Sequence, residues 1–254
     1  MLLVIDIGNT NTVLGVFDGN RLAADWRLET KQRQTADEYG ILARNLFALA
    51  DMEVSKIQHI VIASVVPPLN SVLEQMALKY FKLKPLFVEP GVKTGMPVLY
   101  DSPADVGADR IVNAVAAYER YGGPVIVVDF GTATTFDAIS EKGEYLGGVI
   151  TPGPGISAEA LFARTARLPR VEIKAPAKVI GTSTVGSIQS GLYFGYIGMI
   201  DGILERMLHE LGTKTKIVAT GGYATLIGTG SARIQQIDPN LTLEGLRLIY
   251  ERNR

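Results

Sequence analysis

The sequence contains two copies of one strand–turn–strand–turn–strand pattern, and this internal repeat limits the possible folds more than any other feature. In each copy an apolar run ends in Asp, and one apolar residue, a Gly and several small polar residues follow. Residues 4–12 match residues 127–135 at a constant offset of 123 positions, which aligns Thr12 with Thr135. Two alternating runs come after each copy, at residues 13–18 and 22–28 and at residues 136–140 and 145–150. Such a repeat predicts two similar halves that face each other across a cleft.

The residues at the turns of the repeat suit phosphate binding. A buried strand that ends in Asp6 or Asp129 brings a carboxylate to the edge of a sheet, and a Gly two residues later allows a ligand to approach the backbone. The polar groups that follow could surround a phosphate while the carboxylate holds a cation or its water. They belong to Asn9, Thr10, Asn11, Thr12, Thr132, Thr134 and Thr135. One such segment alone would more simply be a hairpin turn, but two copies with matched strands favour a nucleotide-binding cleft.

The composition excludes several classes of protein. Hydrophobic residues make up 47% of the 254 positions and charged residues 20%, as in a globular protein with one large domain or two of ordinary size. A net charge of −1 argues against general binding to nucleic acids or membrane surfaces. The absence of cysteine excludes disulfides and thiolate catalysis, and His59 and His209 lie too far apart to suggest a metal pair. Because Asp6 would interrupt a signal peptide and no run is long enough to span a bilayer, we expect a cytoplasmic protein.

The order of predicted elements indicates an α/β protein with mixed sheets. After the first three strands come an amphipathic helix that Thr35 caps, a strand at residues 59–66, a second helix and a short strand. The segment at residues 122–124 is a plausible boundary, which gives domains of residues 1–121 and 122–254. Residues 183–211 read as one long helix, or two with a kink, whose regularly spaced glycines favour either a subunit interface or a buried helix. The last helix could fold back onto the first domain.

A loop-rich passage at residues 89–107 leads into a candidate catalytic segment. It ends with Tyr100 and with three Asp and one Arg within ten residues, directly before a helical pattern. Asp105 or Asp109, taken singly, could be only a helix cap. The neighbouring pair Asp109 and Arg110, which opens a helix beside a candidate nucleotide cleft, is better placed for catalysis.

Taken together, these motifs resemble the type III pantothenate kinase family. The resemblance covers nearly the whole chain and rests on Asp-x-Gly-Asn-Thr at residues 6–10, on Tyr100 with Gly-Ala-Asp-Arg at 107–110, on residues 129–135, on Pro152-Gly153 and on residues 220–222. Single motifs are shared with sugar kinases, chaperone ATPases and actin, and the Gly-Ala-Asp-Arg segment narrows the match. The resemblance implies two duplicated ribonuclease-H-like (actin-like ATPase) domains, each a mixed sheet with flanking helices.

The resemblance also implies a reaction and a set of roles. The reaction is ATP-dependent phosphorylation of pantothenate, the first step of coenzyme A synthesis, in a homodimer that pairs through the second domain. Asp109 would be the catalytic base, Asp129 would bind a required monovalent cation (K⁺ or NH₄⁺), and Asp6 would anchor Mg²⁺ through water. The residues implied to bind ATP are Asp6, Ile7, Gly8, Asn9, Thr10, Asn11, Thr12, Val13 and Thr132. Those implied to contact pantothenate are Tyr100, Gly107, Ala108, Asp109, Arg110 and Thr184.

Three other functions compete with this interpretation. A different small-molecule kinase on the same scaffold would differ in the acceptor segment at residues 100–110. A transcriptional accessory factor would not need Asp6, Asp109 and Asp129 together. A nuclease of related fold would use clustered carboxylates and two metals, but the near-neutral charge, without a basic stripe, argues against it.

Overall fold

The computed structural model describes all 254 residues, which form two compact units. Unit 1 comprises residues 1–96, 101–116 and 241–254, and unit 2 comprises residues 97–100 and 117–240. Apart from the short segment of residues 97–100, the chain changes unit within helix α3 (Ala108–Tyr121) and again before helix α6 (Leu241–Asn253). Each unit contains one five-stranded mixed sheet with flanking helices, so the expected fold class is confirmed.

The sheet of unit 1 has the strand order β3-β2-β1-β4-β5. Its strands are β1 (Leu2–Ile7), β2 (Asn11–Asp18), β3 (Arg21–Glu29), β4 (His59–Ser64) and β5 (Leu86–Phe87). The first three strands form an antiparallel meander, and β4 and β5 extend the sheet in parallel with β1. Because β1 and β4 are covered on both faces, their sequences are nearly continuous apolar runs rather than alternating ones.

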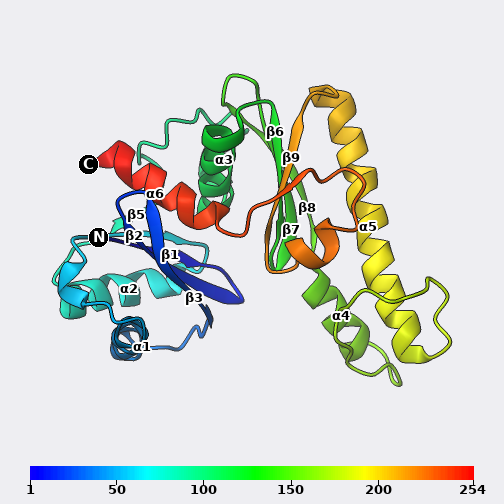
Figure 1. Cartoon of the computed structure of the whole chain (residues 1–254), viewed down its shortest axis with the longest axis horizontal. Helices are drawn as coiled ribbons and strands as arrows, with labels where there is room; N and C mark the ends of the chain where they lie inside the picture. The colour runs from blue at the N-terminus through cyan, green and yellow to red at the C-terminus, as the bar shows by residue number, and fades with distance from the viewer. The chain divides into compact units, whose positions relative to one another are not determined.

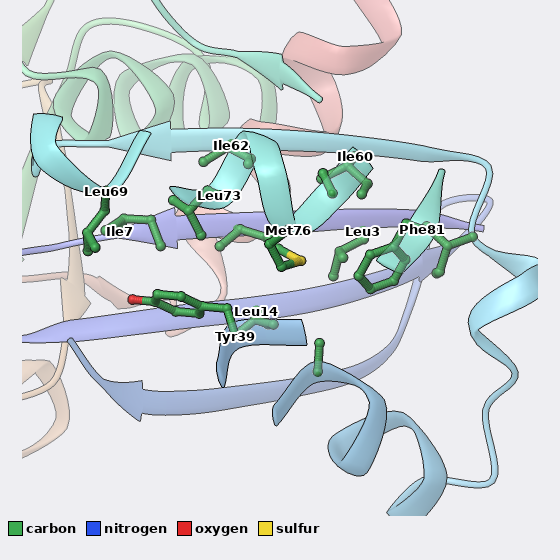
Figure 2. Close-up of a cluster of buried hydrophobic side chains, with 14 of the residues drawn as sticks. Leu3, Ile7, Leu14, Tyr39, Ile60, Ile62, Leu69, Leu73, Met76 and Phe81 are labelled. Carbon is green, nitrogen blue, oxygen red and sulfur yellow. The ribbon is translucent and has the colours of Figure 1, made fainter. Parts of the chain in front are cut away.

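Helices cover the two faces of this sheet (Figure 1). Helices α1 (Ala36–Leu49) and α2 (Asn70–Met76) lie on one face, and α2 continues as a π-helical turn (Ala77–Phe81). Figure 2 shows side chains from these helices and from β1, β2 and β4 meeting in one apolar cluster, which includes Leu3, Tyr39, Ile62 and Met76. Helix α6 lies on the opposite face, where Leu243 packs beside Gly15 and Val4. Short 3-10 turns occur at Val54–Lys56, Pro67–Leu69 and Pro103–Asp105.

The sheet of unit 2 repeats the same order, β8-β7-β6-β9-β10. Its strands are β6 (Val125–Phe130), β7 (Ala133–Ile139), β8 (Tyr145–Pro152), β9 (Lys216–Gly221) and β10 (Gln236–Ile237). Helix α5 (Thr184–Leu211) is one continuous helix of 28 residues and packs on one face of the sheet, where Leu192, Ile200 and Leu204 meet Phe136 (Figure 1). Helix α4 (Pro154–Ala163) and a π-helical turn (Ala224–Gly228) complete the unit. None of the helices combines the length and the apolar character that a membrane-spanning helix needs.

The strand registers confirm the repeat and correct its alignment. Thr12 pairs with Ile7 across the first hairpin, and Thr134, not Thr135, pairs with Phe130 at the matching place in the second. Four residues lie between the paired ends of the first turn and three between those of the second. Residues of β2 therefore correspond to residues of β7 at an offset of 122 positions, not 123. The β-bulges confirm this offset, because the bulge in β2 follows Val16 and the bulge in β7 follows Ala138. The β7–β8 turn is one residue longer than the β2–β3 turn, so the offset between β3 and β8 is again 123 positions. The shorter first turn and the longer second turn of unit 2 cancel, and a count along the sequence does not reveal them.

Candidate active site

The first candidate phosphate loop joins β1 to β2 in unit 1. Asp6 is half-buried near the end of β1, and Gly8 N–H donates to Asn11 O at 2.9 Å, which closes the turn. Asn9 and Thr10 are exposed at its tip, and Gly8, Asn11 and Val13 are half-buried. Ile7 and Thr12 are buried, so their side chains belong to the interior and support the loop. The loop can offer a ligand the Asp6 carboxylate, exposed polar side chains and backbone N–H groups.

One residue that sequence reasoning missed holds this loop. Thr30, directly after β3, donates its hydroxyl hydrogen to Gly8 O at 2.8 Å and lies 2.9 Å from the Thr12 hydroxyl. Its N–H also donates to Thr10 O at 2.9 Å. The repeat could have pointed to this position, because the third strand of each copy must end beside the first turn.

The Gly-Ala-Asp-Arg segment lies at the start of α3, at the same edge of the unit 1 sheet as Asp6. Val65, which follows β4, donates its N–H to Ile7 O at 3.0 Å. Its side chain lies 3.6 Å from the position that a Cβ at Gly107 would occupy. The segment therefore sits beside the carboxyl ends of β1 and β4, where α/β proteins bind ligands.

The Asp109 carboxylate is folded back over the start of its own helix. Arg110 N–H donates to Asp109 Oδ1 at 2.8 Å, and a Cβ at Gly107 would lie only 2.5 Å from the same oxygen. Burial raises the pKa of the Asp109 carboxyl above its usual range, and the Arg110 N–H and the guanidinium charge oppose that shift only in part. A carboxylate with a raised pKa is a stronger proton acceptor. Ala108 is half-buried and the Arg110 side chain is buried.

The second copy places Asp129 at the end of β6 in unit 2. Asp129 pairs with Thr220 of the parallel strand β9, and the next residue of β9, Gly221, has a φ of +94°. A Cβ at Gly221 would lie 2.4 Å from Asp129 Oδ1 and 2.6 Å from Phe130 N. Only glycine combines this backbone conformation with so close an approach, so Gly221 allows β9 to pass directly against the Asp129 carboxylate.

The second candidate phosphate loop, which contains Thr132, is tighter than the first. Gly131 N–H donates to Ala133 O at 3.0 Å, and Gly153 N–H donates to Thr132 O at 2.9 Å. Gly153 lies so close over the turn that a Cβ there would be 2.3 Å from Thr132 O. Thr134 is fully buried, and its hydroxyl has no hydrogen-bond partner.

Tyr100 belongs to unit 2 and is fixed there by β8. Leu99 N–H donates to Tyr145 O and Tyr145 N–H donates to Pro97 O, both at 2.8 Å. The rings of Tyr100 and Tyr145 have centroids 6.4 Å apart. The Tyr145 hydroxyl donates to Asp137 at 2.7 Å, and Thr135 donates to the other Asp137 oxygen at 3.0 Å. The buried carboxylate of Asp137, which sequence reasoning also missed, thus anchors the support beneath Tyr100.

Thr184 is the first residue of α5. Ser183 caps this helix by accepting from Gly186 N–H at 3.1 Å, and Thr184 itself is exposed. Its hydroxyl makes no hydrogen bond within the chain, so it is available to a ligand.

The carboxylates at these positions fit oxygen-bound cations. No group of three or more His, Cys, Asp or Glu side chains is placed to hold a metal ion by itself. Magnesium at phosphoryl-transfer sites is held by one or two carboxylates together with substrate phosphates and water, and Asp6 suits that arrangement. The Asp129 carboxylate is half-buried at the end of β6 and can offer its oxygens to a cation of the same kind.

Comparison with known proteins gives consistent results. A model of the type III pantothenate kinase family matches residues 2–206. The chain is 63% identical to the type III pantothenate kinase of Koribacter versatilis, covering 100% of this chain and 96% of that protein. It is 61% identical to the type III pantothenate kinase of Myxococcus xanthus, covering 100% and 99%. Among solved structures, a conserved putative Baf family transcriptional activator from Campylobacter jejuni matches with a TM-score of 0.61 and 23% identity over 99% of this chain and 98% of that one, which is a likeness of fold.

Proposed function

Since the chain belongs to the type III pantothenate kinase family, it transfers a phosphoryl group from ATP to pantothenate in coenzyme A biosynthesis, and we propose that Asp109 is the base of this reaction. The observation that carries the proposal is the half-buried Asp109 carboxylate with its raised pKa at the start of α3. An aliphatic alcohol is too weakly acidic to be ionised beforehand by a carboxylate. Asp109 therefore orients the terminal hydroxyl of pantothenate and accepts its proton late, as the bond to phosphorus forms.

The proposed ATP contacts follow from the accessible groups of the two loops. Within the proposed ATP-binding segment of residues 6–13, the side chains of Asn9 and Thr10 and the N–H groups of Asn9 and Asn11 bind phosphate oxygens, while Ile7 and Thr12 fix the loop from inside. In unit 2, Thr132 supplies a further phosphate contact. The chain has no lysine-containing phosphate loop of the Walker type, so hairpin turns have to bind the phosphates.

Charge neutralisation is assigned to two carboxylates. Asp6 would hold Mg²⁺ through water, and the bound ion would offset the charge of the ATP phosphates. Asp129 would hold a monovalent cation, K⁺ or NH₄⁺, through its carboxylate oxygens beside Gly221. Both assignments rest on single carboxylates at strand ends.

The acceptor is proposed to be recognised by a small set of side chains and backbone groups. Tyr100, Gly107, Ala108 and Thr184 would contact pantothenate, and the support of Tyr100 by Tyr145 favours a fixed ring position. Arg110 would pair with the pantothenate carboxylate or with a phosphate oxygen, because a guanidinium matches both geometries. The proposed location of this reaction is the cytoplasm.

The kinetic test of this function compares potassium with sodium buffer. We expect ATP consumption that depends on pantothenate and Mg²⁺ and that falls to near background when sodium replaces potassium, with NH₄⁺ restoring it. Equal rates in potassium and sodium would remove the monovalent cation from the proposal and leave the reaction itself intact. ATP consumption without any response to pantothenate would contradict the assigned acceptor.

We also propose that two copies of the chain form a homodimer through unit 2. Three glycines of α5, Gly191, Gly195 and Gly198, lie at helical spacing, and a Cβ at any of them would have no atom of the chain within 4 Å. Apolar side chains are exposed on α4, on the segment between α4 and α5, and at the start of α5, namely Ile156, Leu161, Phe162, Ile180 and Val185. An open glycine stripe flanked by exposed apolar groups allows two helices to approach closely.

Gly195→Arg should convert the dimer to monomers, because the new side chain would occupy the open stripe without disturbing the chain's own packing. Sedimentation velocity at micromolar concentration would measure the change. Glu210→Arg, at an exposed position in the last turn of α5, is the matched control and should leave the dimer intact. An unchanged sedimentation coefficient for Gly195→Arg would place the interface elsewhere.

A further inference from the structure

One residue outside the repeat motifs, Thr30, forms hydrogen bonds with the backbone of the first phosphate loop. Its hydroxyl donates to Gly8 O at 2.8 Å, and because a hydroxyl carries one hydrogen, the 2.9 Å contact with Thr12 makes the Thr12 hydroxyl the donor to Thr30. Its N–H donates to Thr10 O at 2.9 Å. A single residue therefore binds the loop at Gly8, at Thr10 and at the buried Thr12 side chain.

These bonds also fix the direction of the loop's N–H groups. In a trans peptide the N–H points opposite to the C=O. With the carbonyls of Gly8 and Thr10 bound to Thr30, the N–H groups of Asn9 and Asn11 are turned to the other side of the loop. A phosphate is attracted by N–H groups and repelled by carbonyl oxygens, so this arrangement prepares one side of the loop for an anion.

The second copy of the repeat shows what happens without the hydroxyl. Gly153 occupies the position that matches Thr30, since its N–H donates to Thr132 O at 2.9 Å as that of Thr30 does to Thr10 O. Thr134 matches Thr12, and its buried hydroxyl finds no partner, because Gly153 has no side chain. A Cβ at Gly153 would lie 2.3 Å from Thr132 O, so the tight second turn excludes a threonine.

The difference follows turn length. The first turn has four residues between its paired ends and the second has three. A longer turn has more conformational freedom, so more entropy is lost when it is ordered. The hydrogen bonds of the Thr30 hydroxyl therefore occur in the first copy, whose longer turn loses more entropy on ordering.

We propose that Thr30 is a positioning residue for ATP, which orients the loop of residues 8–12 through its bonds to Gly8 and Thr12. The proposal rests on the proposed role of that loop in binding phosphates. Thr30 acts through the loop backbone and does not touch the substrate. Losing its hydroxyl should weaken ATP binding and leave pantothenate recognition unchanged.

The test compares Thr30→Val with Thr30→Ser. Valine keeps the shape and removes the hydroxyl, and the loss of two hydrogen bonds of about 0.5–1.5 kcal/mol each predicts a rise of roughly 5- to 150-fold in the KM for ATP. We expect the KM for pantothenate to stay within about twofold, and serine, which keeps the hydroxyl, to restore the KM for ATP to within about threefold. Thr229→Val removes a hydroxyl bond to Thr225 O in unit 2 and is the matched control, with unchanged constants.

Calorimetric titration with ATP and Mg²⁺ in the absence of pantothenate provides a readout that does not depend on turnover. The affinity of Thr30→Val should fall by the same factor as its KM rises. A lower melting temperature of Thr30→Val with unchanged KM values would show a merely structural role. Equal rises in the KM values for ATP and pantothenate would also overturn the proposal, and so would failure of Thr30→Ser to restore the KM for ATP. If Thr30→Val is insoluble, Thr30→Ala decides by the same criteria. Wild-type protein that bound no ATP would instead overturn the proposed function.

Discussion

Asp109→Asn should reduce kcat by roughly 10²–10⁴-fold, the range by which general-base catalysis accelerates reactions. Asparagine keeps the size of the side chain and its acceptance of the Arg110 N–H, now 2.8 Å from Asp109 Oδ1, but it cannot take a proton from the pantothenate hydroxyl. The KM for ATP should change little. Steady-state kinetics at saturating ATP and pantothenate would measure the loss.

The same substitution should leave the protein at least as stable as the wild type. Burial raises the folded-state pKa of the Asp109 carboxyl above its unfolded value, so the ionised group costs stability at every pH above the folded-state pKa. That cost disappears as the pH falls through the folded-state pKa toward the unfolded one. Asparagine carries no charge, and its melting temperature at neutral pH should equal or exceed that of the wild type.

The pH dependence of the wild-type enzyme should report the same carboxyl group. Since the base acts in its ionised form, kcat/KM should fall as the pH drops through the raised pKa of Asp109. Asp105→Asn, four residues earlier and exposed, is the control and should retain both turnover and this profile. Substantial turnover by folded Asp109→Asn would refute the role of Asp109 as base.

Asp129→Ala should abolish stimulation by potassium and raise the KM for ATP by about tenfold or more, the factor that corresponds to 1.4 kcal/mol. The Asp129 carboxylate packs against Gly221 of β9, where a Cβ would come within 2.4 Å of its oxygen. The substitution removes the charged oxygen ligand that is proposed for the monovalent cation. Rates measured against potassium concentration at fixed ionic strength would show the change.

A matched control separates this effect from general electrostatics. Asp25→Ala removes an equal charge from an exposed position on β3 and should retain the potassium response. If Asp129→Ala remains as strongly stimulated by potassium as the wild type, the cation binds elsewhere and the assignment of Asp129 is wrong.

Sequence patterns predicted those parts of the site that local chemistry determines. The apolar runs that end in Asp6 and Asp129 form the buried strands β1 and β6, and each Asp lies at the carboxyl end of its strand. Asp109 and Arg110 do open a helix, as their position before an apolar periodicity predicted. These features depend on a few neighbouring residues, so a single sequence contains the signal.

The features that were missed depend on pairing between distant segments. The contacts of Thr30 with the first loop require the β2–β3 register, and the attachment of residues 97–100 to Tyr145 requires an edge of β8 that no local pattern marks. The alignment of Thr12 with Thr135 was wrong because two changes in turn length cancel along the chain. Counting residues along the sequence cannot reveal an offset between the two copies that changes in one strand and returns in the next.

The different turn lengths of the two hairpins also indicate how the halves of a duplicated protein can diverge. A residue gained or lost within a strand would move every later side chain to the opposite face of the sheet. A change in a turn leaves the strand faces intact, and the bulge shared by β2 and β7 shows that their inner register survived. Turn length is therefore the variable through which two copies of one ancestral hairpin could acquire different ligands while each kept its own core.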